Sequence, residues 1–486
     1  MTAVDLAVMG LYFAVVVGIG SYFARRQRDA TDYFLGRRQL PWWAVMLSIV
    51  ATETSALTVI SVPALGARGN LTFLQLAFGY LIGRIGVAVL LLPGYFTGEQ
   101  DTAYARLQTR FGPGTRRAAS GIFMAIRALG DSVRVFASAI PLAIVTGWSI
   151  PVSVLVVAGV TLLYTWRGGL QAVVWVDVLQ LGLYIVGGVT AVIVASSLVG
   201  GLGPALHSAS EAGKLAVFDM RFSFTAPYTF VAALLGGALL SAASHGTDHL
   251  IVQRLLATRS LSAARKALIG SGLLVIVQFG LFLLVGTMLW AAGLDDGSGS
   301  GDQLFPNFIV EHLPVGLSGL VIAGVLAAAM STVSSSLNSL ASATTHDFYA
   351  PLTGRTDAKH LLAVGRWATV GWAIVLAGGA LSFRSTDQPV VELALSIASI
   401  AYGGLLGTYV LGGIVPAAKG RDAVLALAVA TITMVVVVLL KPGPLADLAW
   451  PWYVPLGLAI TIATGVVSTG IRTRVPFERR KDGPLG

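Results

Sequence analysis

The residues of this chain best suited to bind a ligand are hydroxyl side chains gathered in one apolar helical segment. Seven of the last nine positions of "AAAMSTVSSSLNS" (residues 327–339) are Ser, Thr or Asn. Residues three or four apart share one face of a helix, and hard cations prefer oxygen ligands. The pattern therefore indicates a binding face for a cation such as Na⁺, while a serine-rich face that serves helix packing fits the same residues.

Charged side chains form a second candidate group, in "AIRALGDSVRVFA". Arg127, Asp131 and Arg134 follow one another at i, i+4 and i+7, so they lie on one helical stripe. Asp131 can neutralise one arginine, and a buried guanidinium without a partner is costly. Two explanations stay open. Either a substrate carboxylate is the missing counter-ion, or Glu53 or Asp248 pairs with the remaining arginine.

Further ionisable residues interrupt other apolar stretches. They lie in "ATETS", "FGYLIGRIGV" and "SAASHGTDH", and are Glu53, Arg84, His245, Asp248 and His249. Such residues are costly in apolar helices and usually face a cavity or one another. The two histidines and Asp248 could sketch a metal site, but no H-E-x-x-H pattern accompanies them, so metal catalysis is not favoured. Arg84 weakens the argument for an anionic substrate, because it needs a carboxylate partner as well.

The elements that carry these residues are predicted to span a membrane. Hydrophobic residues make up 55% of the 486 positions and charged residues 11%, whereas ordinary globular domains carry roughly 25% charge. Apolar runs of roughly 20 residues, the length that crosses a hydrocarbon core, recur along the chain. The chain has no cysteine and no P-loop pattern, which excludes disulfides, thiolate chemistry and ATP hydrolysis. Uphill transport would therefore need an ion gradient.

The distribution of basic residues predicts the topology. Lys and Arg fall in alternate loops, and short basic loops stay cytoplasmic, which places the N-terminus outside the cell membrane and the C-terminus inside. The net charge of +9 is then explained by topology and not by a nucleic-acid partner. The first apolar stretch lacks a basic start and a cleavage site, so we expect a retained span. In all, we expect about thirteen spans, near residues 5–24, 41–66, 72–96, 117–146, 149–166, 171–198, 226–257, 267–293, 315–343, 362–383, 390–415, 421–440 and 451–470.

The second and seventh predicted spans are interrupted by polar residues near their centres and lie five spans apart. Since five is odd, the two spans cross the membrane in opposite directions. In inverted-repeat transporters, paired discontinuous helices bind ions or substrate near the midplane through freed backbone groups. We therefore expect a binding site at these breaks. Close helix packing is the alternative, and it explains the Ser, Gly and Ala residues but not the charged ones.

Four segments spread along the chain carry a resemblance to a known family. They are "AAAMSTVSSSLNSLASATTHDFY", "RGGLQAVVWVDVLQLGLYIVGG" (167–188), "GTDHLIVQRLLATRS" (246–260) and "GGLLGTYVLGG" (403–413). Together they resemble the sodium/solute symporters, which are related to the sodium/glucose cotransporters and to bacterial sialic acid and proline transporters. The third segment nearly matches the family's G-T-D-Q-x-x-x-Q-R pattern, with His249 where Gln is common.

The resemblance implies an all-α polytopic fold with a leucine-transporter-like core of two inverted five-helix repeats. One extra N-terminal helix and its cytoplasmic loop (1–38) would precede the first repeat (39–200). The second repeat (201–418) would be followed by two additional helices and a cytoplasmic tail (419–486). This division fits the expected number of spans.

The resemblance also implies sodium ligands, carried over by position. The main site would use backbone carbonyls of the broken helix and carbonyl and hydroxyl groups of the opening motif: Ala51, Thr54, Ala328, Ser331 and Thr332. A second sodium site, as in the sialic acid branch, would use the hydroxyls of Ser55, Thr58, Ser331, Ser334 and Ser335. Asp177 matches an acidic residue near the family's intracellular sodium exit. Its alternative role is a helix-end charge paired with a basic loop.

A substrate cavity is expected between the two broken helices. Its candidate residues are Glu53, Phe73, Gln75, Arg134, Asp248 and Ser399. Glu53 matches a functional Asp of the proline transporters, and Arg134 is the better candidate for the arginine that binds the substrate carboxylate in sialic acid transporters. An organic anion such as sialic acid or a monocarboxylate is therefore the leading substrate, and a neutral sugar, amino acid or polyol the alternative. Several sugar-binding positions of the glucose cotransporters have no clear match, so a hexose is not favoured.

These features predict a sodium-coupled secondary transporter that works by alternating access, and not an enzyme. Na⁺ would be the coupling ion without an organic cofactor, and the partners would be a small-molecule solute and the lipid bilayer, with no obligatory protein partner. A channel would need a continuous polar lining, whereas polarity here is confined to a few helices. A sensor would need a signalling domain. Proton coupling or facilitated transport on the same fold remains the alternative.

Overall fold

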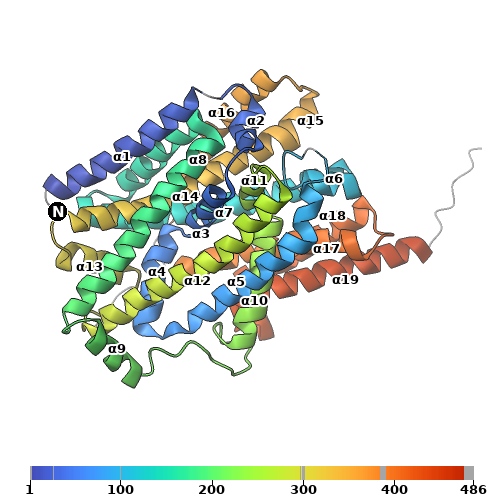
Figure 1. Cartoon of the computed structure of the whole chain (residues 1–486). Helices are drawn as coiled ribbons and strands as arrows, with labels where there is room; N and C mark the ends of the chain where they lie inside the picture. Colours follow the sequence, from blue (N-terminus) through green and yellow to red (C-terminus); the bar gives the residue numbers. More distant parts are fainter. Residues whose placement is uncertain are drawn as a thin grey trace, which may run out of the picture.

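The computed structural model describes residues 3–25, 27–98, 100–295, 297, 301–383 and 390–474, and this part of the chain contains helices but no strand. The helices form one bundle (Figure 1). The longer ones are α1 (Ala3–Ala24), α3 (Trp42–Glu53), α4 (Ala56–Arg68), α5 (Leu74–Gly86), α7 (Pro113–Thr146), α8 (Ile150–Ser197), α10 (Phe230–Gly246), α12 (Leu261–Ala291), α14 (Leu317–Ala343), α16 (Ala358–Ser382), α17 (Val390–Ile414), α18 (Gly420–Leu440) and α19 (Tyr453–Arg474). The shorter ones are α2 (Ala30–Leu35), α6 (Ala105–Phe111), α9 (Leu202–Glu211), α11 (His249–Leu256), α13 (Leu304–His312) and α15 (Ala350–Thr353).

Two apolar segments are broken near their centres. The helices on either side of the α3–α4 break are bent by 64°, and α10 and α11 are bent by 59°. At the first break Thr54 (ψ 89°) and Ser55 (ψ 171°) leave the helical region. At the second, Asp248 is extended and its carboxylate accepts a hydrogen bond from the backbone N–H of Leu250 at 2.8 Å, which caps α11. The prediction that the second and seventh spans are interrupted is confirmed.

Nine helices in the described residues are long and apolar enough to cross a membrane, and each bent pair adds one span if it is counted as such. α8 has 48 residues, and about 20 residues suffice to cross a hydrocarbon core. It is interrupted at Gly169, whose φ of +58° suits glycine. A Cβ at Gly169 would lie 2.5 Å from the carbonyl oxygen of Tyr33. Glycine therefore permits both the turn and the close packing of α2, at the loop predicted between the fifth and sixth spans.

α14, which carries the hydroxyl-rich motif, lies in the interior of the bundle. It is buried from Val321 to Ala343 and packs against α1, α7, α8 and α16 (Figure 1). Small residues allow these helices to approach closely. A Cβ at Gly324 would lie only 3.1 Å from the Cα atom of Tyr184 in α8. The hydroxyls of the motif therefore face other helices and not the surroundings of the protein.

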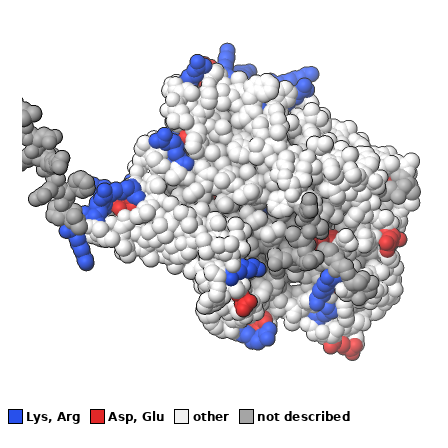
Figure 2. All heavy atoms as spheres, turned by 180° about the vertical axis from the view of Figure 1, so that it is seen from behind, with Lys and Arg blue, Asp and Glu red and all other residues white. Residues whose placement is uncertain are grey.

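The outer helices turn large apolar side chains outward. Leu11, Leu90, Val277, Ile374 and Leu440 are all at least 67% exposed. Figure 2 shows one face of the molecule, on which Lys and Arg lie toward the upper, left and lower parts and the broad middle carries few charges. An apolar girdle between charged ends is the surface of a protein embedded in lipid.

Candidate ion and substrate site

The hydroxyl face of α14 meets the broken end of α3. Thr332 Oγ1 donates to the carbonyl oxygen of Thr52 at 3.1 Å and to that of Ala328, in its own helix, at 3.4 Å. Gln278 of α12 donates its side-chain amide to Thr54 Oγ1 and so holds the break from the other side. The five residues of the expected main sodium site are all buried and come from these two elements: Ala51, Thr54, Ala328, Ser331 and Thr332.

Asp177 lies beside this junction, on the inner face of α8. Its carboxylate accepts hydrogen bonds from Ser331 Oγ at 2.6 Å and from Ser48 Oγ at 2.5 Å. It also forms an ion pair with Arg254 of α11, with Oδ2 and Nη2 3.2 Å apart and both side chains fully buried. Asp177 therefore lies inside a helix, and its arginine belongs to α11. The alternative of a helix-end charge paired with a basic loop is wrong.

The residues of the expected second sodium site are divided between two elements. On α14, Ser334 and Ser335 both donate to the carbonyl oxygen of Ser331, at 3.0 and 2.6 Å. Ser335 also contacts Thr52 Oγ1 at 3.1 Å and accepts a hydrogen bond from Arg254. Ser55 and Thr58 are buried at the start of α4, across the break.

A cavity of about 100 Å³ lies between the two breaks. Four of the six expected substrate residues line it: Glu53, Phe73, Arg134 and Asp248. The described lining does not include Gln75, which donates to the carbonyl oxygen of Tyr228 at 2.9 Å, or Ser399, which donates to that of Leu395 at 2.7 Å. The rest of the lining includes side chains that the sequence did not single out for this role: Tyr80, Arg127, Ser244, His245, Phe279 and Tyr402.

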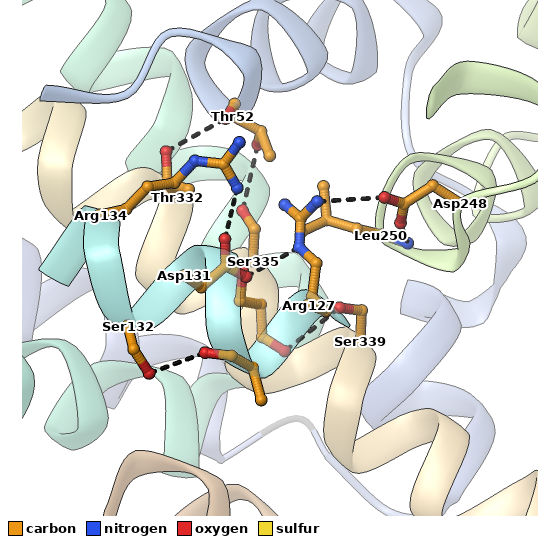
Figure 3. A network of polar contacts seen from close by, with 12 residues as sticks. Thr52, Arg127, Asp131, Ser132, Arg134, Asp248, Leu250, Thr332, Ser335 and Ser339 are labelled. Atoms are coloured by element: carbon orange, nitrogen blue, oxygen red, sulfur yellow. Dashed lines mark hydrogen bonds and ion pairs between the residues drawn. The ribbon is translucent and has the colours of Figure 1, made fainter. Parts of the chain in front are cut away.

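The charged stripe of α7 forms one network with the second break (Figure 3). Asp131 lies between two arginines, with Oδ2 2.7 Å from Arg127 Nε and Oδ1 2.5 Å from Arg134 Nη1. Arg127 Nη1 reaches Asp248 Oδ2 at 3.0 Å, and Tyr402 donates its hydroxyl to the same oxygen at 2.7 Å. The sequence left open whether Asp248 pairs with an arginine of this stripe. The structure shows that it pairs with Arg127.

Glu53, in the cavity wall, forms a fourth ion pair, with Arg84 of α5. His245 Nε2 lies 3.7 Å from the same carboxylate. Three arginines at the cavity are therefore matched by three carboxylates, so the charge balance alone does not require an anionic substrate. The arginines are Arg84, Arg127 and Arg134, and the carboxylates are Glu53, Asp131 and Asp248. His249 points elsewhere, toward Ser342 Oγ at 3.0 Å, and the described residues contain no group of three acidic, His or Cys side chains that could hold a metal ion.

The least compensated cation at the cavity is Arg134. Arg127 has two carboxylates, whereas in the described part of the chain the one acidic partner of Arg134 is Asp131, which it shares. The Arg134 side chain is 16% exposed and lines the cavity. Phe73 and Phe279, with ring centroids 5.3 Å apart, supply apolar surface in the same lining. The cavity can therefore receive a small solute with one acidic and one apolar part.

Two broken helices around a buried polar centre are typical of secondary transporters, in which such breaks lie where ions and substrate bind. A sequence profile of the sodium:solute symporter family matches residues 33–415. The chain belongs to the sodium:solute symporter family. The resemblance of its motifs is thereby confirmed, and the protein is a multi-pass membrane protein that couples uptake of a small organic solute to sodium.

Individual relatives agree with this assignment. The chain is 30% identical over 436 residues to sodium-coupled monocarboxylate transporter 2 of Mus musculus, covering 86% of this chain and 69% of that one. It is 27% identical over 487 residues to the sodium/sialic acid symporter SiaT of Proteus mirabilis, covering 96% and 94%.

Two solved structures share the fold. One is a Na⁺-coupled sialic acid symporter in a substrate-bound, outward-open state, with a TM-score of 0.88, 26% identity and coverage of 97% of this chain and 98% of that one. The other is Mhp1, a nucleobase-cation-symport-1 family transporter, with a TM-score of 0.61, 13% identity and coverage of 93% and 98%. At this low identity the second likeness shows the fold alone.

Proposed function

We propose that sodium binds between the first break and α14, and that the solute binds in the cavity between the two breaks. The sodium ligands are the carbonyl oxygens of Ala51, Thr54 and Ala328 and the hydroxyls of Ser331 and Thr332. The burial of all five residues supports this assignment, as does the contact of Thr332 with the end of α3. Buried oxygen ligands without a formal charge suit a hard monovalent cation.

The direction of the hydroxyl protons supports a cation at this place. Ser331 donates its proton to Asp177, and Thr332 donates its proton to a backbone carbonyl. Each hydroxyl oxygen keeps lone pairs after it has donated, and these can face a cation. Asp177 therefore has a second role beside that of a charge on the sodium exit path, because it fixes the orientation of a ligand.

A second sodium ion binds at Ser331, Ser334 and Ser335 together with Ser55 and Thr58 across the break. The two hydrogen bonds that converge on the carbonyl oxygen of Ser331 support this by holding the three serines as one group. Transport would then use two sodium ions per cycle.

The solute is an organic anion, either sialic acid or a monocarboxylate. The observation that carries this proposal is Arg134, a partly exposed arginine in the cavity wall that shares its described carboxylate with Arg127. Its remaining N–H groups can bind a substrate carboxylate by charge-assisted hydrogen bonds. The names of the monocarboxylate and sialic acid relatives point to the same class.

A neutral sugar, amino acid or polyol is the second candidate. The balance of three arginines and three carboxylates around the cavity favours it. Asp248 lines the cavity as a hydrogen-bond acceptor, which would suit a hydroxyl or ammonium group of such a solute.

The transport cycle follows from differential affinity. Sodium drives uptake only if it binds the outward-facing state better than the inward-facing one. A cation that joins α3 and α14 favours the state in which these helices are close. When they separate, the ligand set opens and the ion leaves past Asp177. Coupling to protons or facilitated transport is not needed in this scheme.

The proposed architecture has thirteen spans. The nine apolar helices supply nine, the two broken pairs supply two and α7 supplies one. The last comes from α8, which is one of the nine and is counted as two spans on either side of Gly169. The core consists of inverted repeats at 39–200 and 201–418. The N-terminus lies outside the cell membrane and the C-terminus in the cytoplasm. The contact of Asp5 with the first turn of α14, where Ser318 donates to it at 2.8 Å, supports one common side for the starts of α1 and α14.

The experiment is uptake by the purified chain in liposomes with an inward sodium gradient. The labelled solutes are a sialic acid, a short monocarboxylate, a neutral sugar, a polyol and an amino acid. We expect one anion to accumulate in sodium and not in potassium. Accumulation of a neutral solute alone would contradict the anion proposal, and equal accumulation in potassium would contradict the sodium ligands.

A further inference from the structure

A groove of about 610 Å³ lies apart from the transport cavity, where the end of α1 meets the α8 kink and α16. Three arginines line it: Arg25, directly after α1, Arg167, two residues before the kink, and Arg366 in α16. Among the described lining residues none is acidic, and in the described part of the chain these three arginines form no ion pair. This differs from the transport cavity, where every arginine has a carboxylate.

Two hydrogen-bond donors in this groove lack an acceptor. Arg366 Nε and Trp166 Nε1 are buried atoms without a hydrogen-bond partner in the described structure. Both residues line the groove. A buried donor left without a partner costs free energy; both atoms are shielded from the surface, so they would gain an acceptor only if these two side chains turned toward a ligand in the groove.

The wall behind the groove is firmly built. Tyr33 of α2 donates its hydroxyl to the carbonyl oxygen of Thr165 at 3.2 Å and lies 3.2 Å from Thr369 Oγ1, which ties α8 to α16. Gln27 donates to the carbonyl oxygen of Gly168 at 3.1 Å and so fixes the chain that leaves α1. The arginines are therefore carried by a fixed frame.

Apolar surface continues from the groove toward the centre of the membrane. Leu163 precedes Arg167 by one helical turn in α8 and is 54% exposed, and Ile374 follows Arg366 by about two turns in α16 and is 68% exposed. Tyr22 and Trp166 line the groove itself, and such aromatic side chains are typical of the headgroup level. A ligand in the groove would therefore have its charged end among arginines and its remainder along lipid-facing side chains.

From these contacts we infer that the groove binds the phosphodiester headgroup of an anionic phospholipid, whose acyl chains lie along Leu163 and Ile374. A basic pocket between membrane helices is the kind of place where anionic headgroups bind. The apolar continuation favours a lipid over a free phosphate, because inorganic phosphate would use the arginines alone. The bound lipid would hold α1 against α8 and α16.

The test is the thermal stability of the purified full chain in neutral detergent, titrated with phosphatidylglycerol, phosphatidylcholine or inorganic phosphate. The variant is R167Q/R366Q. The control is R117Q/R421Q, which removes two exposed arginines outside the groove. We expect phosphatidylglycerol to stabilise the wild type and the control alike. In R167Q/R366Q its half-effect concentration should rise about 25-fold, because each arginine near a lipid surface contributes about fivefold.

Three outcomes would overturn the inference. The first is that phosphatidylglycerol stabilises the wild type and R167Q/R366Q equally. The second is that phosphatidylcholine stabilises the wild type as much as phosphatidylglycerol does. The third is that inorganic phosphate alone gives the full stabilisation, which would indicate a site for a soluble anion. If R167Q/R366Q does not fold, the single variants replace it. Native mass spectrometry of the wild type from an equal mixture of the two lipids should then retain phosphatidylglycerol in excess, and equal retention would contradict the site.

Discussion

The two breaks in the transmembrane helices are alike in geometry and different in chemistry. Both bend by about the same angle, 64° and 59°. At the α3–α4 break, Thr52 and Thr54 offer carbonyl and hydroxyl oxygens to α14 and α12, and the nearby carboxylate of Glu53 is turned to Arg84. At the α10–α11 break, the carboxylate of Asp248 itself faces Arg127.

This difference suggests a division of labour between the breaks. Uncharged oxygens suit a sodium ion that must be released in every cycle, whereas charged side chains at a fixed spacing suit the recognition of a solute. Variants at the first break should therefore change the sodium dependence of transport, and variants at the second should change the concentration dependence on solute. The predictions below test this separation.

The largest effect is expected for D177N. It leaves the fully buried Arg254 without its carboxylate, and removal of one partner of a buried pair costs about 3–5 kcal/mol. Thermal unfolding in detergent should show a large loss of stability, which D177N/R254Q restores in part. The matched control is D219N, which breaks the exposed pair with Arg221 and should cost less than about 1 kcal/mol. Similar losses in D177N and D219N would refute the buried role of Asp177.

The second-largest effect is expected for S331A/T332A, which removes two hydroxyls of α14 beside the first break. Loss of two hydroxyl ligands at about 1–2 kcal/mol each should raise the half-saturating sodium concentration about 30- to 1000-fold. Solute affinity at saturating sodium should change much less. S339A is the control, because Ser339 is buried on the same helix and donates only within it, to the carbonyl oxygen of Ser336. If uptake by the double variant kept the sodium dependence of the wild type, Ser331 and Thr332 would not be sodium ligands.

R134Q tests the charged network that joins α7 to the second break. Loss of one charge-assisted contact of about 1.5–3 kcal/mol should raise the KM for an anionic solute about 10- to 150-fold. The sodium dependence should stay near that of the wild type, and R134K should recover part of the affinity. R355Q, which alters an exposed arginine, serves as the control. An unchanged KM in R134Q would favour the neutral solute.

The smallest effect is expected for S334A, which removes one ligand of the proposed second sodium site. Sodium titrations of uptake should give a Hill coefficient above one in the wild type and a value closer to one in the variant. Transport at saturating sodium should persist. A Hill coefficient of one in the wild type would indicate a single sodium ion per cycle and contradict the second site.

Local features of the structure could be predicted from the sequence. The breaks at Thr54 and at Asp248 follow from polar and small residues inside apolar runs, since such residues are costly on a continuous lipid-facing helix. The kink at Gly169 coincides with a basic loop between two apolar runs. The hydroxyl face of α14 follows from helical spacing alone.

Pairings between helices could not be predicted in the same way. Asp177 and Arg254 are 77 positions apart, and Arg127 and Asp248 are 121 apart. Neither pair has a spacing signal, because the contact exists only after the helices pack. Arg254 does lie in the family motif "GTDHLIVQRLLATRS", but the motif does not name its partner. For the same reason the sequence suggested a spare guanidinium, whereas the structure pairs every arginine at the cavity.

The most direct test of the division of labour is thermal stability in sodium against equimolar potassium, for the wild type, S331A/T332A and R134Q. A ligand at about 100 times its dissociation constant stabilises the native state by about 2.7 kcal/mol. We expect a sodium-specific rise in Tm for the wild type and for R134Q, and a much smaller rise for S331A/T332A. Loss of the sodium response in R134Q with its retention in S331A/T332A would contradict the account.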